Sequence, residues 1–201
     1  MSALTTFLTL GFHHIVDLDA MDHLLFLIAL AAVYRLQDWR SALWVITAFT
    51  VGHSITLAMA VIGVVRLPTS LIEFLIPLTI VATCAENLFA RARAAGSGHR
   101  KFRALLAGVF GLVHGSGFAN YLQSLFVDRV AVPLVGFNLG IELGQVVILM
   151  GATGAFFLVD WMIRRVARNA TPAAAFRMRL IGVSAVCGVF AVHMAAMRSP
   201  L

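Results

Sequence analysis

A short stretch near the start of the chain gathers three histidines and three aspartates within 11 residues, just before a run that is almost entirely apolar. Its members are His13, His14, Asp17, Asp19, Asp22 and His23. Imidazole and carboxylate groups are ligands that proteins offer to zinc, nickel, cobalt and iron, whereas copper(I) favours sulfur donors, which are not clustered in this chain. We therefore interpret the stretch as the mouth and first wall of a divalent-metal site.

More polar side chains interrupt the long apolar segments that follow. An ionisable side chain costs about 2.5–3.5 kcal/mol inside a bilayer on insertion scales, so each one requires a partner. We predict that these side chains converge, and that the metal ligands are His14, Asp17, Asp22, His23, His53, His114 and Glu142. Positions beside the ligands or along a pathway are assigned to Asp19, Glu73, Asn138, Gln145, His193 and Glu86.

Spacing along the segments supports this convergence. Asn138, Glu142 and Gln145 recur at i, i+4 and i+7, which places them on one face of a helix. Two sets of glycines spaced three or four residues apart accompany the polar residues: Gly136, Gly140 and Gly144, and Gly108, Gly111 and Gly115 around His114. Such glycine stripes allow a second helix to pack closely.

Structural explanations compete with the metal site. A lone histidine in a membrane helix, such as His193, is more often hydrogen-bonded within a core than bound to a metal. Glu86 has the alternative of bonding to Asn87 or to a neighbouring helix. For the joint set, the alternative is a purely structural polar network, but such a network does not need so many ionisable groups at one depth.

The composition places the chain in the membrane class. Of its 201 residues, 61% are hydrophobic and 12% are charged, whereas soluble domains carry about 25% charged residues. We predict an all-α, polytopic transmembrane bundle in which residues 1–201 form one domain. Six full spans are expected at 20–34, 41–65, 69–90, 104–126, 132–161 and 180–197. Residues 3–16 are apolar but short, and they predict an interfacial or re-entrant helix, or a tilted seventh span.

The basic residues predict the orientation. Segments 35–40, 91–103 and 162–179 carry 12 of the 15 Lys and Arg residues, and positive charges accumulate on the cytoplasmic side of a membrane. We therefore expect a multi-pass protein of the bacterial inner membrane, with basic loops in the cytoplasm and the His/Asp cluster toward the periplasm. Because the basic residues behind the net charge of +6 lie in loops, they do not indicate nucleic-acid binding.

Four motifs in order resemble the HupE/UreJ family of small membrane proteins, which is associated with nickel or cobalt uptake for hydrogenase and urease maturation. They read GFHHI with DHLLF, then FTVGHSITL, FGLVHGSGFA and FNLGIELGQ, and the resemblance covers nearly the whole chain. It implies a permease-like polytopic fold and metal handling by His14, Asp22 and His23.

Three functions are compatible with these residues. The first is a divalent-cation transporter, for nickel or cobalt, although few polar residues line the inner half of the spans. The second is an intramembrane metalloenzyme in which zinc or a two-metal centre activates water. The third is a metal-binding accessory subunit. The expected partners are the divalent ion and the lipid bilayer, with a homo-oligomer or a membrane or metallochaperone partner as further options.

Overall fold

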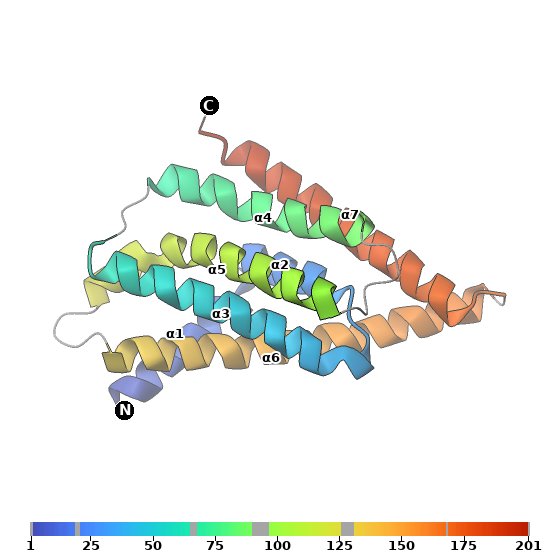
Figure 1. The fold of residues 1–201 in the computed structure, drawn as a ribbon, viewed down its shortest axis with the longest axis horizontal. Helices are drawn as coiled ribbons and strands as arrows, with labels where there is room; N and C mark the ends of the chain where they lie inside the picture. Colours follow the sequence, from blue (N-terminus) through green and yellow to red (C-terminus); the bar gives the residue numbers. More distant parts are fainter. Residues whose placement is uncertain are drawn as a thin grey trace.

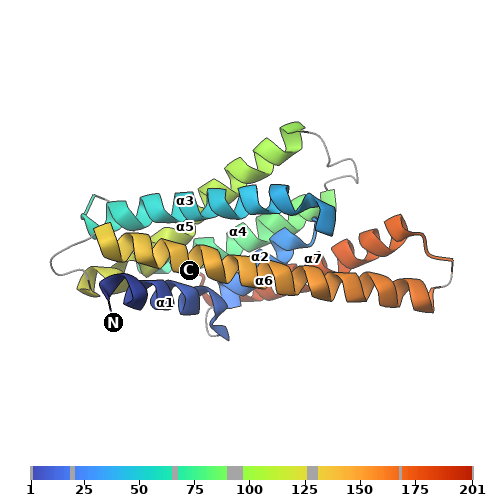
Figure 2. The same cartoon turned by 90° about the horizontal axis from the view of Figure 1, so that it is seen from below.

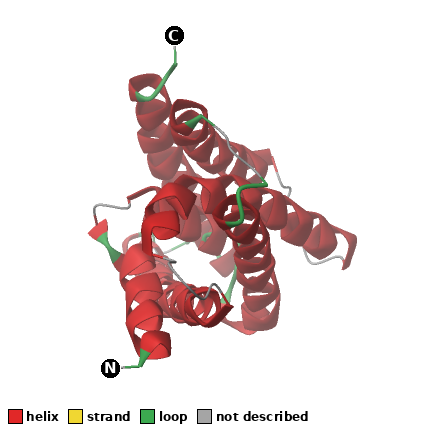
Figure 3. Cartoon of the chain, turned by 90° about the vertical axis from the view of Figure 1, so that its left-hand side faces the viewer, coloured by secondary structure: helices red, strands yellow, loops and turns green. Residues whose placement is uncertain are grey.

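The computed structural model describes residues 2–18, 21–64, 68–89, 97–125, 131–167 and 169–200. Helices and connecting loops make up this part of the chain, and no strand occurs in it (Figures 1 and 3). The elements are α1 Ala3–Val16, α2 Met21–Ala31, the 3-10 helix η2 Leu36–Asp38, α3 Trp39–Val61, α4 Thr69–Phe89, α5 Ser97–Leu125, α6 Ala131–Val166 and α7 Pro172–Met197. The predicted all-α helical bundle is therefore confirmed.

Four stretches of the described chain are long and apolar enough to cross a membrane: Leu36–Ala60, Thr69–Phe89, Ala131–Val166 and Pro172–Met197. The helices run back and forth along the long axis of the molecule (Figure 1). At one end of it, α2, α4 and α6 finish and α3, α5 and α7 begin (Figures 1 and 2). The sequence segments that join the helices at this basic end carry most of the Lys and Arg residues.

The first two helices are short and follow one another in the same direction along that axis (Figures 1 and 2). α1 has 14 residues and α2 has 11, which corresponds to about 21 Å and about 16 Å of helix. Each length falls short of the roughly 30 Å of a bilayer's hydrocarbon core. The break between them brings His14, near the end of α1, beside His23, near the start of α2, with 4.7 Å between ring centroids.

Glycines let the helix backbones approach closely at the two most extensive interfaces, α3–α5 and α1–α6. A Cβ atom on Gly115 of α5 would collide with the carbonyl oxygen of His53 on α3. A Cβ atom on Gly140 of α6 would likewise collide with the carbonyl oxygen of Leu8 on α1. The prediction that both glycine stripes accept a second helix is thus confirmed.

The core between these helices is apolar except for a few polar side chains. Phe26, Phe49 and Phe137 are among the largest fully buried residues, and His53 and His114 are buried just as deeply. A polar group in such surroundings costs free energy unless a hydrogen bond or a metal compensates it. The two histidines therefore require an explanation from their neighbours.

Candidate metal centre

Three histidines from three helices meet at one buried point. His14 comes from the last turn of α1, His23 from the first turn of α2 and His53 from α3. One ring nitrogen from each of them lies within 4.8 Å of those from the other two. His23 is 6% exposed and His53 is fully buried. Imidazole nitrogens grouped in this way are suited to bind one transition-metal ion.

His114 on α5 places a fourth imidazole beside these three. Its ring centroid lies 5.2 Å from that of His23, and the residue is 1% exposed. The next residue, Gly115, packs against the backbone of His53 and so draws α5 toward the cluster. We refer to His14, His23, His53 and His114 as the histidine cluster.

Asp22 orients the ring of His23. Its Oδ1 lies 3.0 Å from Nδ1 of His23 and also accepts the backbone N–H of His23 at 2.9 Å. An ionised carboxylate can only accept, so Nδ1 carries the proton and Nε2 presents its lone pair. That Nε2 is buried and has no hydrogen-bond partner among the described residues. It is therefore available as a metal ligand.

Thr79 on α4 sets the tautomer of His114. The Thr79 hydroxyl donates to the carbonyl oxygen of Ile76 at 2.7 Å, and its oxygen lies 3.0 Å from Nε2 of His114. Because the single hydroxyl proton is already used, Thr79 accepts from Nε2–H, which leaves the lone pair of His114 on Nδ1. Within the described part of the chain, that Nδ1 is buried without a hydrogen-bond partner.

Both ring nitrogens of His53 are also buried without a partner in the described structure. A buried polar atom left unsatisfied costs about 1–3 kcal/mol, and four such nitrogens belong to His23, His53 and His114. A divalent metal ion bound among the rings would compensate for part of this cost, through one lone pair on each of the three rings. Neutral imidazole is a good ligand for nickel, cobalt and zinc, so the donor set fits the metals expected from the sequence.

Arg198, directly after α7, contacts the carboxylate that orients the cluster. Its Nη1 lies 3.4 Å from Oδ2 of Asp22, so both oxygens of that carboxylate are engaged. The side chain of Arg198 is 34% exposed and that of Asp22 is 13% exposed. The guanidinium therefore offsets part of the negative charge next to His23.

The polar stripe of α6 bonds to α3 rather than to the histidines. Thr47 donates to Oε1 of Glu142 at 2.7 Å, and Thr50 donates to Oε1 of Gln145 at 2.9 Å. Thr50 and Thr47 precede His53 by about one and two helical turns. Because α3 starts at the basic end, these two pairs lie between His53 and that end.

One expected ligand, Asp17, and the other residues expected beside the ligands or along a pathway are dispersed. Asp17 is exposed after α1, Glu73 and His193 are exposed on α4 and α7, and Asn138 is half-buried on α6. Asp19 lies outside the described residues. Glu86 forms an ion pair with Arg103 of α5, which is a bond to a neighbouring helix.

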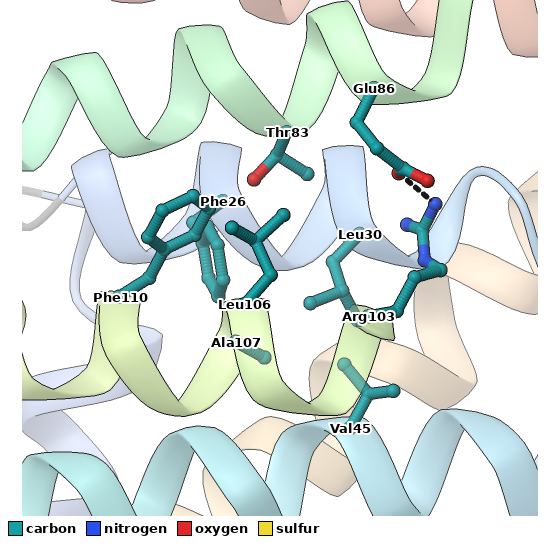
Figure 4. A pocket seen from close by; sticks show the side chains of 9 residues that line it. All are labelled: Phe26, Leu30, Val45, Thr83, Glu86, Arg103, Leu106, Ala107 and Phe110. Carbon is teal, nitrogen blue, oxygen red and sulfur yellow. Dashed lines mark hydrogen bonds and ion pairs between the residues drawn. The ribbon is translucent and has the colours of Figure 1, made fainter. Parts of the chain in front are cut away.

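Toward the basic end, the rings of Phe26 and Phe110 and this ion pair lie between α2, α4 and α5 (Figure 4). The ring centroid of Phe26 lies 5.5 Å from that of His114 and 6.2 Å from that of Phe110. The cavity that adjoins these rings and the Glu86–Arg103 pair has a volume of about 10 Å³, which is room for about one water molecule. A cation moving this way would meet apolar rings and then a guanidinium that is 5% exposed.

The ion pair belongs to a polar network that joins four helices. Asn87 of α4 accepts from Arg103 at 3.1 Å and donates to the carbonyl oxygen of Ala29 at 2.7 Å and to Ser184 of α7 at 3.2 Å. The Arg103 guanidinium also lies 5.6 Å from the ring centroid of Tyr34. The network holds α2, α4, α5 and α7 together at the basic end.

Sequence reasoning missed Thr79 and Arg198, which hydrogen-bond to His114 and to Asp22. Thr79 is separated by 35 residues from His114, and Arg198 by 176 residues from Asp22. A helical threonine that orients a distant histidine has no local pattern that distinguishes it from any other helical threonine. Thr79 could have been expected only from the general rule that a buried imidazole requires a hydrogen-bond partner, here on a neighbouring helix.

A bundle of long apolar helices around a buried histidine cluster defines a polytopic helical membrane protein with a candidate metal centre. The family model described as HupE / UreJ protein matches residues 1–195. The chain belongs to the HupE/UreJ family, a family of membrane proteins linked to nickel and cobalt handling, as its four motifs predicted. No curated protein and no solved structure matches the chain.

Proposed function

We propose that this protein transports a divalent cation, with nickel or cobalt as the cargo, across the bacterial inner membrane toward the cytoplasm. The observation that carries the proposal is the meeting of His14, His23 and His53 from three helices at one buried point. Membership of the HupE/UreJ family supplies the choice of metals. Zinc prefers the same donors and belongs among the ions to be compared.

The break between α1 and α2 supports a transport site. Neither helix is long enough to cross a bilayer alone, and we infer that the two together form one interrupted crossing. Interrupted helices whose ends face the cargo recur in transporters. The C-terminal end of α1 favours a cation through its carbonyl dipoles, and Asp22 places a negative charge in the first turn of α2.

The α3–α6 interface offers the better route from the cluster toward the basic end. The Thr–Glu and Thr–Gln pairs there begin one turn from His53, and Glu142 supplies a half-buried carboxylate as the next binding position. On the α4–α5 side, an ion would meet the rings of Phe26 and Phe110 and then the buried charge of Arg103. Electrostatic repulsion by a buried guanidinium makes that side unfavourable for a divalent cation.

Transport is favoured over the metalloenzyme because the carboxylate beside the cluster is already engaged. A metal-bound water needs a base within hydrogen-bond reach to accept its proton. Asp22 is bonded through one oxygen to His23 and through the other to Arg198. We therefore assign Asp22 to orienting His23 and to compensating the charge of the cation.

The test is metal influx into proteoliposomes that contain the purified protein and a metal-sensitive dye, with nickel, cobalt or zinc added outside. The parent chain is expected to show saturable influx, and His53→Ala to abolish it. His193→Ala, an exposed histidine of α7, is the matched control and should retain the parent rate. Metal that stays bound in a fixed ratio through purification, with no influx, would contradict transport and favour an accessory or enzymatic centre.

Glu142→Gln tests the inward route separately from the binding step. The amide keeps an acceptor for Thr47 but removes the negative charge, so influx is expected to fall at least tenfold, the effect of about 1.4 kcal/mol. Equilibrium binding of the metal to the purified protein should change far less. Glu73→Gln removes an exposed carboxylate on α4 and serves as the control. Equal influx in the two variants would reject Glu142 as part of the route.

A further inference from the structure

A groove of about 820 Å³ opens between the α6–α7 hairpin and segment 34–43, at the basic end of the molecule. The hairpin extends beyond the other helices at this end (Figures 1 and 2). The wall formed by α6 covers residues 146–164, and α7 contributes from its first two turns. None of the residues that line the groove belongs to the histidine cluster.

The walls of the groove are apolar along α6 and become aromatic at the basic end. Met150 and Phe157 expose 71% and 69% of their surface, and Trp39 and Trp161 expose 54% and 49%. From Val146 to Trp161, α6 rises about 22.5 Å, which is about half the roughly 40–45 Å thickness of a whole bilayer. Tryptophan is enriched where lipid headgroups begin. The groove therefore has the depth of one leaflet.

Positive charge gathers at the aromatic end. Asp160 and Arg179 neutralise each other through an ion pair of 2.9 Å. Arg35 and Arg164 also line the groove, and neither forms an ion pair with a carboxylate in the described structure. The guanidinium of Arg35 lies over the ring of Phe176 at 4.6 Å from its centroid. Two positive charges without an ion-pair partner in the described structure therefore lie at the tryptophan end of the groove.

We propose that this groove binds one anionic glycerophospholipid of the leaflet on the basic side. Its phosphate lies between Arg35 and Arg164, and an acyl chain follows the apolar wall of α6 toward Val146. Basic pockets between membrane helices favour anionic headgroups in this way. A second copy of the chain fits less well, because a two-fold contact through this surface would bring the same basic groups of both copies together. The inference is independent of the transported ion.

Native mass spectrometry of the purified protein with phosphatidylglycerol or phosphatidylcholine is the first test. The parent chain is expected to retain one phosphatidylglycerol under activation that removes phosphatidylcholine. Because each arginine near an anionic lipid contributes about 1 kcal/mol, the double variant Arg35→Gln/Arg164→Gln should bind phosphatidylglycerol about thirtyfold more weakly. The control Arg100→Gln/Arg177→Gln removes two exposed arginines outside the groove and should bind as the parent does.

A second pair of variants tests the acyl part of the groove without changing any charge. Gly154 lines the groove and Gly182 does not, and a Cβ atom at either position would meet nothing within 4 Å. Gly154→Phe should therefore lower retention of phosphatidylglycerol, whereas Gly182→Phe should not. Equal retention of both lipids, unchanged binding in the arginine double variant, or a lipid-free dimer disrupted by Gly154→Phe would overturn the proposal.

Discussion

Two hydrogen bonds determine which nitrogens of His23 and His114 are available to a metal. Asp22 holds the proton of His23 on Nδ1, and Thr79 holds the proton of His114 on Nε2. Each bond leaves the other ring nitrogen as a buried lone pair without a partner in the described structure. The ligand character of these two histidines therefore depends on side chains that do not themselves belong to the histidine cluster.

Asp22→Ala is predicted to weaken metal binding by about 10–100-fold, as is usual when the partner of a ligating histidine is removed. Asp22→Asn should weaken it less, because the amide oxygen still accepts from Nδ1 of His23. Nickel titration of the purified variants in a calorimeter gives both affinities. Parent-like affinity in Asp22→Ala would show that the ring of His23 is held in place without this carboxylate.

Thr79→Val is predicted to weaken metal binding about tenfold, because Nε2–H of His114 loses its acceptor, a change of about 1–2 kcal/mol. Thr79→Ser keeps the hydroxyl and should bind as the parent does. Valine has nearly the same shape as threonine, so loss of packing does not explain a difference between these variants. The measurement is the nickel affinity of each variant beside its thermal unfolding midpoint. A weaker affinity in both variants would contradict the role of the hydroxyl.

Metal binding should also weaken as the pH falls, because a protonated imidazole has no lone pair to offer.

The same side chains show how far the sequence predicts the site. Residue type and depth placed His23 and His53 among the seven predicted ligands, the family motif added His14, and the structure brings these three together. Glu142 was grouped with them for its depth, yet it bonds to Thr47 across the α3–α6 interface. Depth along a helix is readable from sequence, whereas the direction in which a side chain points depends on how the helices are rotated.

At the scale of the helices, the sequence predicted the all-α architecture and the close glycine contacts. Hydropathy and glycine spacing are local properties of the sequence, so they can be recognised without knowledge of the tertiary structure. The sequence did not reveal whether residues 3–16 and the following helix form one crossing, because two short apolar helices resemble two separate elements. Their shared direction and the meeting of His14 with His23 support our proposal that the two form one interrupted crossing.

Gly115→Ala and Gly140→Ala are each predicted to lower the free energy of unfolding by about 1–3 kcal/mol, as expected for overpacking against a neighbouring backbone. At these positions a Cβ atom would collide with backbone carbonyl oxygens of α3 and α1. Gly182→Ala, with nothing within 4 Å, should stabilise α7 by up to about 1 kcal/mol. Unfolding in detergent titrations measures all three, and equal stability of the three variants would argue against tight packing at these interfaces.

Over the whole molecule, the helices are packed differently around the metal centre and at the basic end. The centre requires α1, α2, α3 and α5 to approach closely. At the basic end, the Arg103 network fixes α2, α4, α5 and α7, while a groove opens between the α6–α7 hairpin and segment 34–43. Movement of α6 against α3 would open the pairs made by Thr47 and Thr50 without breaking that network.

An interrupted crossing by α1 and α2 has one consequence that a separate seventh span at residues 3–16 does not share. It places the start of α1 on the same side of the membrane as the start of α4, and opposite the start of α7. With the basic segments in the cytoplasm, Ala3→Cys and Ser70→Cys should react with a membrane-impermeant maleimide on intact cells. Ala173→Cys should react only after permeabilisation. The parent chain is the control, because Cys84 and Cys187 are each 3% exposed. Labelling of Ala3→Cys together with Ala173→Cys, rather than with Ser70→Cys, would show that α1 is a crossing of its own.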